Sequence, residues 1–178
     1  MKRKVLVVDD HPIVREGLAL LINREPDLTV CGDAEDMHKA LQIMELLKPD
    51  ILIIDIGLSG PDGLDLLKNI RAKDPSLPVL ILSMHDESIY AERALRAGAN
   101  GYIMKQEATE KVLVALRRIL NREIYVSPLI ANKMLQHFVG GGVNHSTRSS
   151  FDGLSDRELE VLRLIGCGHG TRQIADEL

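Results

Sequence analysis

Three aspartates follow two runs of large apolar residues, and their placement predicts metal-assisted chemistry. Asp9 and Asp10 follow the run 4–8, and Asp55 lies near the end of the run 51–56. Apolar runs of this length are typical of strands buried on both faces of a parallel sheet. Because the carboxyl ends of such strands meet at one edge of the sheet, we expect the three carboxylates to lie together. Like charges in such a cluster repel one another unless a hard cation such as Mg2+ binds between them.

The elements that must hold these carboxylates alternate between strand and helix patterns. This strict alternation indicates an α/β domain, a doubly wound parallel sheet with helices on both faces and right-handed crossovers. We predict strands over 4–8, 28–32, 51–56, 78–83 and 101–104. We predict helices over about 12–24, 36–48, 63–73, 87–97 and 108–121.

The pattern changes after the fifth helix. Ser127 and Pro128 are the residue types that begin a helix, so a short helix is expected through Phe138. The segment 140–150 is rich in glycine and serine, which is typical of a flexible linker.

A second helical unit begins at Leu154. Ser155 and Glu158 form a capping box in front of a run with helical apolar spacing. Thr171 begins another helix in which the sequence stops. Two amphipathic helices joined by a glycine-containing turn resemble the start of a helix-turn-helix motif.

Composition limits the class of protein. The 178 residues carry a net charge of −4 without a strongly basic block, so charge gives no indication of nucleic acid or membrane binding. The two cysteines, Cys31 and Cys167, have no partner at metal-ligand spacing, which suits a reducing compartment. No apolar run approaches the roughly 20 residues of a membrane span, and the N-terminus lacks a signal-peptide pattern. We therefore expect a cytoplasmic protein that does not bind membranes.

Further residues at the expected strand ends give the chain a family resemblance. The set Asp9-Asp10-His11-Pro12, Asp55, Ser83 and Gly101-Tyr102-Ile103-Met104-Lys105 resembles a response-regulator receiver domain. The run 154–162 and the residues after it resemble the opening of a LuxR-type DNA-binding domain. Together they are similar to the NarL/FixJ family of two-component transcription factors.

The resemblance implies a fold and a domain plan. It implies a flavodoxin-like (βα)5 sheet with strand order 2-1-3-4-5, followed by a linker and a partial all-α helix-turn-helix domain. The receiver would span 1–122, a linker with a short helix would span 123–153, and the first part of the DNA-binding domain would span 154–178. The recognition helix would lie beyond Leu178. The DNA-binding residues are therefore unknown, and we do not expect this chain by itself to bind DNA specifically.

The resemblance also implies a phosphoacceptor site. Asp55 would accept a phosphoryl group from a histidine kinase and form an acyl phosphate. Mg2+ would be bound by Asp10 and Asp55 directly, by the Gly57 carbonyl, and by Asp9 through water. Lys105 would pair first with the carboxylate and then with a phosphoryl oxygen.

A switch would respond to that phosphoryl group. Ser83 would donate its hydroxyl to a phosphoryl oxygen and move inward, and Tyr102 would rotate from exposed to buried. Gly57 and His85 would tune the access of water to the acyl phosphate, although His85 could equally be a solvated loop residue. Taken singly, Ser83 could make only local hydrogen bonds, Tyr102 could be a packing aromatic, and Lys105 could be a surface lysine.

One departure from the family affects the loop after Asp55. Leu58 and Ser59 stand where receivers of this family usually carry Met-Pro, and a proline comes later at Pro61. Because proline fixes φ, its absence at Ser59 is expected to loosen the loop and shift Mg2+ affinity or phosphate lifetime.

The favoured function is therefore a phosphorylation-dependent transcriptional regulator that can form a homodimer on phosphorylation. Its only catalysis would be its own phosphoryl acceptance and slow autodephosphorylation. A stand-alone receiver that acts through protein–protein contacts is the main alternative. An aspartyl phosphatase usually has a second acid two residues after its nucleophile, where this chain has Gly57. A flavodoxin-like electron carrier would place a flavin phosphate against three carboxylates, which would repel it.

Overall fold

The computed structural model describes residues 1–58, 62–139, 154, 156–166 and 168–177. A five-stranded parallel sheet in the order β2-β1-β3-β4-β5 forms its centre, which confirms the predicted fold. The strands are β1 (Arg3–Val8), β2 (Leu28–Ala34), β3 (Ile51–Asp55), β4 (Val79–Ser83) and β5 (Gly101–Met104).

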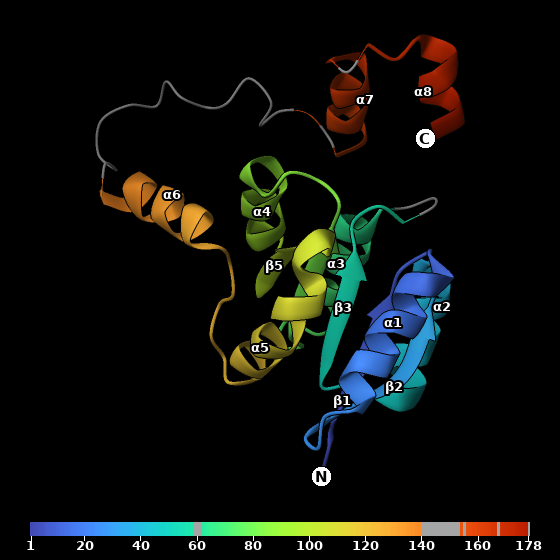
Figure 1. Cartoon of the computed structure of the whole chain (residues 1–178), viewed down its shortest axis with the longest axis vertical. Coiled ribbons are helices and arrows are strands. Elements are labelled where there is room, and N and C mark those ends of the chain that lie inside the picture. The colour runs from blue at the N-terminus through green and yellow to red at the C-terminus, as the bar shows by residue number, and fades with distance from the viewer. Residues whose placement is uncertain (59–61, 140–153, 155, 167, 178) are drawn as a thin grey trace. The chain divides into compact units, whose positions relative to one another are not determined.

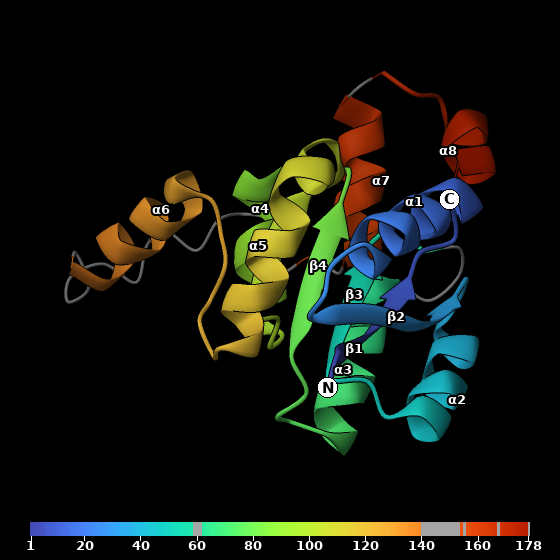
Figure 2. The ribbon, with the colours of Figure 1, turned by 60° about the horizontal axis from the view of Figure 1, so that its bottom comes forward.

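Five helices cover the two faces of the sheet. Figures 1 and 2 show α1 and α5 on one face and α2, α3 and α4 on the other. Their bounds are α1 (Pro12–Asn23), α2 (Met37–Leu47), α3 (Gly63–Lys73), α4 (Glu87–Arg96) and α5 (Ala108–Leu120), with a 3-10 turn η1 (Lys105–Glu107) before α5. Each bound lies within one residue of the sequence prediction.

Local capping explains where three of these helices begin. The Asp36 side chain accepts the Lys39 N–H, the Asp62 side chain accepts the Asp65 N–H, and the Asp86 side chain accepts the Ser88 N–H. Such caps satisfy backbone donors that have no partner inside the helix. They hold the starts of α2, α3 and α4 at the carboxyl end of the sheet.

The core is aliphatic and centred on the middle strands. Every residue of β3 and β4 is buried, and α1 and α5 pack Ile22 and Leu116 against one face of the sheet. Burial on both faces accounts for the unbroken apolar runs of these strands.

β2 is longer than the sequence predicted. It continues to Ala34 instead of ending at residue 32, and its pairing with β1 shifts register between Val5 and Leu6. The pairing then runs on to the end of β1, and the Asp9 N–H donates to the Ala34 carbonyl. The extension arises because β1 needs a hydrogen-bonding partner on that side up to its last residue.

The contacts divide the chain into units of residues 1–135 and 136–178. This division places residues 123–135, which the sequence analysis assigned to the linker, in the first unit. Helix α6 (Pro128–Val139) begins as predicted, with the Ser127 hydroxyl accepting the Ile130 N–H. The glycine- and serine-rich part of the expected linker, within 140–153, lies outside the described residues.

The second unit contains α7 (Asp156–Gly166) and α8 (Thr171–Glu177). The His169 N–H donates to the Leu164 carbonyl, and Gly168 has φ +85, which suits the left-handed turn that ends a helix. Ser155 of the expected capping box lies outside the described residues. In the part of the chain that the structure describes, no helix is long and apolar enough to span a membrane.

Candidate phosphoacceptor and magnesium site

The ends of β1 and β3 bring the predicted carboxylates together. These strands are hydrogen-bonded neighbours, so Asp9 and Asp55 emerge side by side at the carboxyl edge of the sheet. Asp9 is only 1% exposed and Asp55 is 4% exposed. One ligand atom from each of Asp9, Asp10, His11 and Asp55 lies within 4.8 Å of the others.

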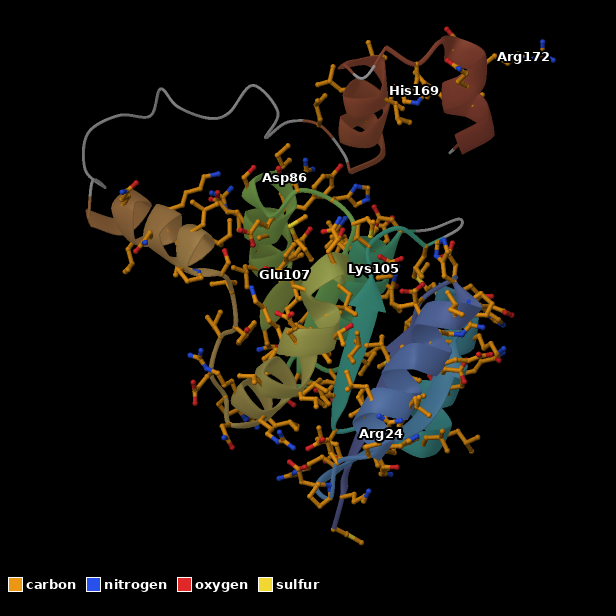
Figure 3. The ribbon with its side chains drawn as sticks, viewed as in Figure 1. Arg24, Asp86, Lys105, Glu107, His169 and Arg172 are labelled. Atoms are coloured by element: carbon orange, nitrogen blue, oxygen red, sulfur yellow. The ribbon has the colours of Figure 1, made fainter. Side chains whose placement is uncertain are left out.

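Lys105 reaches this cluster from the end of β5. Its Nζ lies 2.7 Å from Asp55 Oδ2 and 2.7 Å from Asp9 Oδ2, so one ammonium bridges both buried carboxylates. Figure 3 shows Lys105 toward the arrowhead end of β3, whereas Arg24 lies toward the opposite end of the sheet. The prediction placed Lys105 against the carboxylate of Asp55, and the structure adds the contact with Asp9.

The negative charge of the Asp55 carboxylate is only partly compensated by its surroundings. Burial raises the pKa of Asp55, the hydrogen bond and charge of Lys105 oppose this, and the Asp9 charge adds to the rise. Burial lowers the pKa of Lys105, but its hydrogen bonds to Asp55 and Asp9 outweigh burial and leave the pKa raised. The Lys105 ammonium is therefore charged, and Asp55 lacks full charge compensation from it alone.

The donor set fits Mg2+. Three carboxylates converge on one point, and oxygen donors are the ligands that Mg2+ prefers. A divalent cation there would favour the ionised form of Asp55, against the burial and the Asp9 charge that raise its pKa. The Gly57 N–H donates to Asp55 Oδ1 at 3.2 Å, which holds the loop after β3 beside this carboxylate.

His11 is a neighbour of the carboxylates that the sequence analysis did not place in the metal set. Its Nδ1 lies 2.6 Å from Asp10 Oδ1 and 3.4 Å from Asp9 Oδ1, while most of its ring is exposed. Its place in the Asp9-Asp10-His11-Pro12 motif was the sequence feature that pointed to it.

Ser83 and Tyr102 lie beside each other at the ends of β4 and β5. Ser83 is fully buried and its Oγ accepts the His85 N–H at 3.0 Å. The Tyr102 hydroxyl donates to the His85 carbonyl at 2.9 Å, and burial raises the pKa of Tyr102 far above its usual value, with the Ser83 hydroxyl opposing the rise. Tyr102 is 2% exposed, so it already occupies the inward orientation that the switch hypothesis assigned to the phosphorylated state.

Of the two expected tuning positions, Gly57 lies beside Asp55, and His85 lies near Gly57. A Cβ built on Gly57 would lie 3.7 Å from Asp55 Oδ2 and 4.0 Å from His85 Nε2. The His85 ring stacks on Tyr90, with ring centroids 4.6 Å apart. Leu58 is buried, whereas Ser59 and Pro61 of the unusual loop lie outside the described residues.

Gly63 is a positioning residue that the sequence analysis missed. A Cβ built on it would lie 1.9 Å from the backbone oxygen of Asp55, and its N–H donates to the Ile56 carbonyl at 2.9 Å. The start of α3 therefore touches the backbone that carries Asp55, and only glycine allows this approach. The Asp62-Gly63 pair marked a turn, but no local pattern revealed what the turn packs against.

Arg15 also supports the site from a distance in sequence. Its Nη1 donates to the Asp9 carbonyl at 2.7 Å and its Nε to Asp33 Oδ2 at 2.8 Å. It thereby ties α1 to the ends of β1 and β2.

A buried aspartate at the end of β3, beside the two aspartates that follow β1 and the lysine that follows β5, is the arrangement expected of a receiver domain on this sheet. Residues 5–117 match the family model described as response regulator receiver domain. The chain belongs to the response regulator family, in its NarL/FixJ branch with LuxR-type C-terminal helices.

Relatives and solved structures agree with this assignment. The oxygen regulatory protein NreC of Staphylococcus haemolyticus is 37% identical over 182 residues, which cover 98% of this chain and 82% of that protein. A LuxR-family two-component response regulator from Aurantimonas is 36% identical with a TM-score of 0.71, over 78% of this chain and 99% of that one. The RcsB response regulator of Salmonella typhimurium is 26% identical with a TM-score of 0.69, over 99% of this chain and 82% of that one.

Family membership establishes the general role. Response regulators receive phosphoryl groups from histidine kinases, receiver domains bind Mg2+ at their acidic pocket, and LuxR-type members bind DNA. The chain is thus a signalling protein of phosphorylation-dependent transcription regulation.

Proposed function

We propose that Asp55 accepts the phosphoryl group, with Mg2+ bound by Asp10, Asp55 and the Gly57 carbonyl, and by Asp9 through water. Phosphorylation then controls DNA binding or dimerisation of this regulator. The observation that carries the proposal is the burial of Asp55 between Lys105 and Asp9 at the end of β3.

The residues suit in-line phosphoryl transfer. A carboxylate oxygen of Asp55 forms a bond to phosphorus while the bond from phosphorus to the imidazole nitrogen of the kinase histidine breaks, and the histidine leaves neutral after taking up a proton. Mg2+ held by these carboxylates would supply positive charge to the phosphoryl oxygens. The Lys105 ammonium donates a hydrogen bond to Asp55. After transfer it can donate to a phosphoryl oxygen, which then carries the negative charge.

Ser83 and Tyr102 carry the switch in this proposal. When the Ser83 hydroxyl donates to a phosphoryl oxygen, its orientation toward the His85 N–H changes. The inward Tyr102 hydroxyl stabilises the same loop through the His85 carbonyl. A Tyr102→Ala variant that responds to phosphorylation like the parent would contradict this route.

The proposed phosphoacceptor is tested by intact-mass measurement after incubation with Mg2+ and acetyl phosphate. The parent is expected to gain one phosphoryl group, and Asp55→Asn is expected to gain none. Asp50→Asn is the matched control, because Asp50 precedes the same strand at its other end and bonds to Arg3. Labelling of Asp55→Asn, or loss of labelling in Asp50→Asn, would overturn the assignment.

The proposed output is tested by light scattering after gel filtration, with Mg2+ and beryllofluoride against Mg2+ alone. Beryllofluoride stands in for the phosphoryl group. A shift from monomer to dimer supports dimerisation driven by the receiver. An unchanged mass with beryllofluoride bound argues against it and leaves control of the C-terminal helices as the output.

A further inference from the structure

The chain that leaves α5 returns to the free edge of β5. The Tyr125 N–H donates to the Asn100 carbonyl at 2.9 Å, and the Tyr125 carbonyl accepts the Tyr102 N–H at 2.9 Å. Gly101 pairs with Tyr125 in a β-bridge, and a Cβ on Gly101 would lie 2.7 Å from the Tyr125 oxygen. The segment after the receiver is therefore hydrogen-bonded to both sides of this glycine, including the backbone of the switch tyrosine.

The same segment then contacts the first turn of α4. The Ser127 hydroxyl donates to Glu87 Oε1 at 2.8 Å, and Lys133 Nζ donates to the Ser88 carbonyl at 2.9 Å. Between these two contacts, Ile130 is buried to 1% exposure. Figures 1 and 2 show the start of α6 beside α4.

The two elements that residues 125–133 contact, β5 and the first turn of α4, also position the proposed switch residues Ser83 and Tyr102. The first turn of α4 directly follows the loop 84–86, in which the His85 N–H donates to Ser83 Oγ and the His85 carbonyl accepts the Tyr102 hydroxyl. Figure 3 shows Asp86 at the end of α4 that lies toward the carboxyl edge of the sheet. A displacement of this loop would therefore move Glu87 and Ser88, which are the acceptors for Ser127 and Lys133.

We propose that residues 125–133 form a linker clamp, an intramolecular partner that binds the start of α4 and the edge of β5 when Tyr102 points inward. The proposal rests on the proposed function, since it requires a phosphoryl group on Asp55 to favour the inward state. Phosphorylation then tightens the clamp and restrains the chain that leads to α7 and α8. By thermodynamic linkage, loss of the clamp weakens binding of the phosphoryl mimic by the same factor.

The test is hydrogen–deuterium exchange of the full chain with Mg2+, with and without beryllofluoride. In the parent, beryllofluoride is expected to slow exchange of the α6 amides by about fivefold or more, the low end of allosteric coupling. Lys133→Ala is expected to exchange faster in α6 and to lose this response. Asn132→Ala is the control on the same helix, because Asn132 is exposed there and alanine favours the helix at both positions.

Two results separate the clamp from the proposed phosphoacceptor. If beryllofluoride leaves the peptides around Asp55 unprotected in the parent, the proposed function fails. If it protects them while Lys133→Ala and Asn132→Ala behave alike in α6, the clamp is wrong. Titration calorimetry of beryllofluoride provides the reciprocal measurement, with a fivefold weaker affinity expected for Lys133→Ala alone.

Discussion

The two ends of the same sheet use ion pairs in opposite ways. At the carboxyl end, Lys105, Asp9 and Asp55 have side chains that are 10%, 2% and 4% exposed. At the amino end, Arg117 pairs with Asp27 at 2.8 Å, and both side chains are close to half exposed. Similar distances therefore occur in very different surroundings.

The difference appears in the carboxyl pKa values. Burial raises the pKa of Asp55 despite Lys105, whereas the hydrogen bond to Arg117 lowers the pKa of the exposed Asp27 to about 2. An ion pair in water needs little desolvation, while a buried pair must overcome it. The carboxyl end is thus held in a charged arrangement that folding alone does not favour, which is typical of a functional site.

The largest expected effect tests how tightly the carboxyl end is packed. Gly63→Ala would place a Cβ 1.9 Å from the Asp55 backbone oxygen, so α3 or β3 must shift. We expect a loss of about 3 kcal/mol or more in the free energy of unfolding, at the upper end of overpacking effects. Urea denaturation measures it, and phosphoryl acceptance by Asp55 should fall with it.

Gly17→Ala is the control for Gly63→Ala. A Cβ on Gly17 meets nothing within 4 Å, and the residue lies inside α1. Alanine should therefore stabilise the protein by about 0.5–1 kcal/mol through helix propensity. Equal losses in the two variants would show that the close approach of α3 to Asp55 does not matter.

The next effect sharpens the comparison through metal binding. Mg2+ at about ten times its dissociation constant should stabilise the parent by about 1.4 kcal/mol. Asp10→Asn removes a carboxylate from the cluster and should abolish most of this gain, while Asp50→Asn at the amino end should retain it. Thermal unfolding with Mg2+ and with EDTA gives both values. A full gain in Asp10→Asn would exclude that carboxylate as a ligand.

The sequence predicted the strands, the helices and the acidic cluster because these depend on local patterns, whereas the strand order was implied by the family resemblance. The apolar runs before Asp9 and Asp55 determine where strands end, and strand alternation determines that those ends meet. The contact of Lys105 with Asp9, the approach of Gly63 to Asp55 and the bridge from Tyr125 to β5 were not predicted. Each joins residues that are brought together only by the folded chain, so no local periodicity reports it.

Opposite pH dependences should follow from the opposite pKa shifts. Without Mg2+, Asp55→Asn should raise stability at pH 7, because the buried carboxylate with its raised pKa costs stability once pH exceeds the unfolded pKa. This gain should fade as pH falls toward 4. Asp27→Asn should lower stability at pH 7, and its effect should disappear as pH falls from about 4 through about 2.

Urea denaturation midpoints across pH 2–7 measure the stability of Asp55→Asn and Asp27→Asn against the parent. The parent, Asp55→Asn and Asp27→Asn should give curves that converge at the acid end. A loss of stability at pH 7 in Asp55→Asn would mean that Lys105 fully compensates the buried carboxylate. The contrast between the two ends of the sheet would then disappear.

The smallest effect is expected at an exposed pair at the end of α3. Lys73 Nζ lies 3.0 Å from Glu45 Oε1, with both side chains more than half exposed. Lys73 lowers the pKa of Glu45, but solvent screens this attraction on the surface. Lys73→Met should therefore leave the urea midpoint unchanged at both low and high salt. A loss of stability that is present at low salt and absent at high salt would show that exposed pairs also stabilise this fold, and the amino end would then resemble the carboxyl end more closely than its exposure indicates.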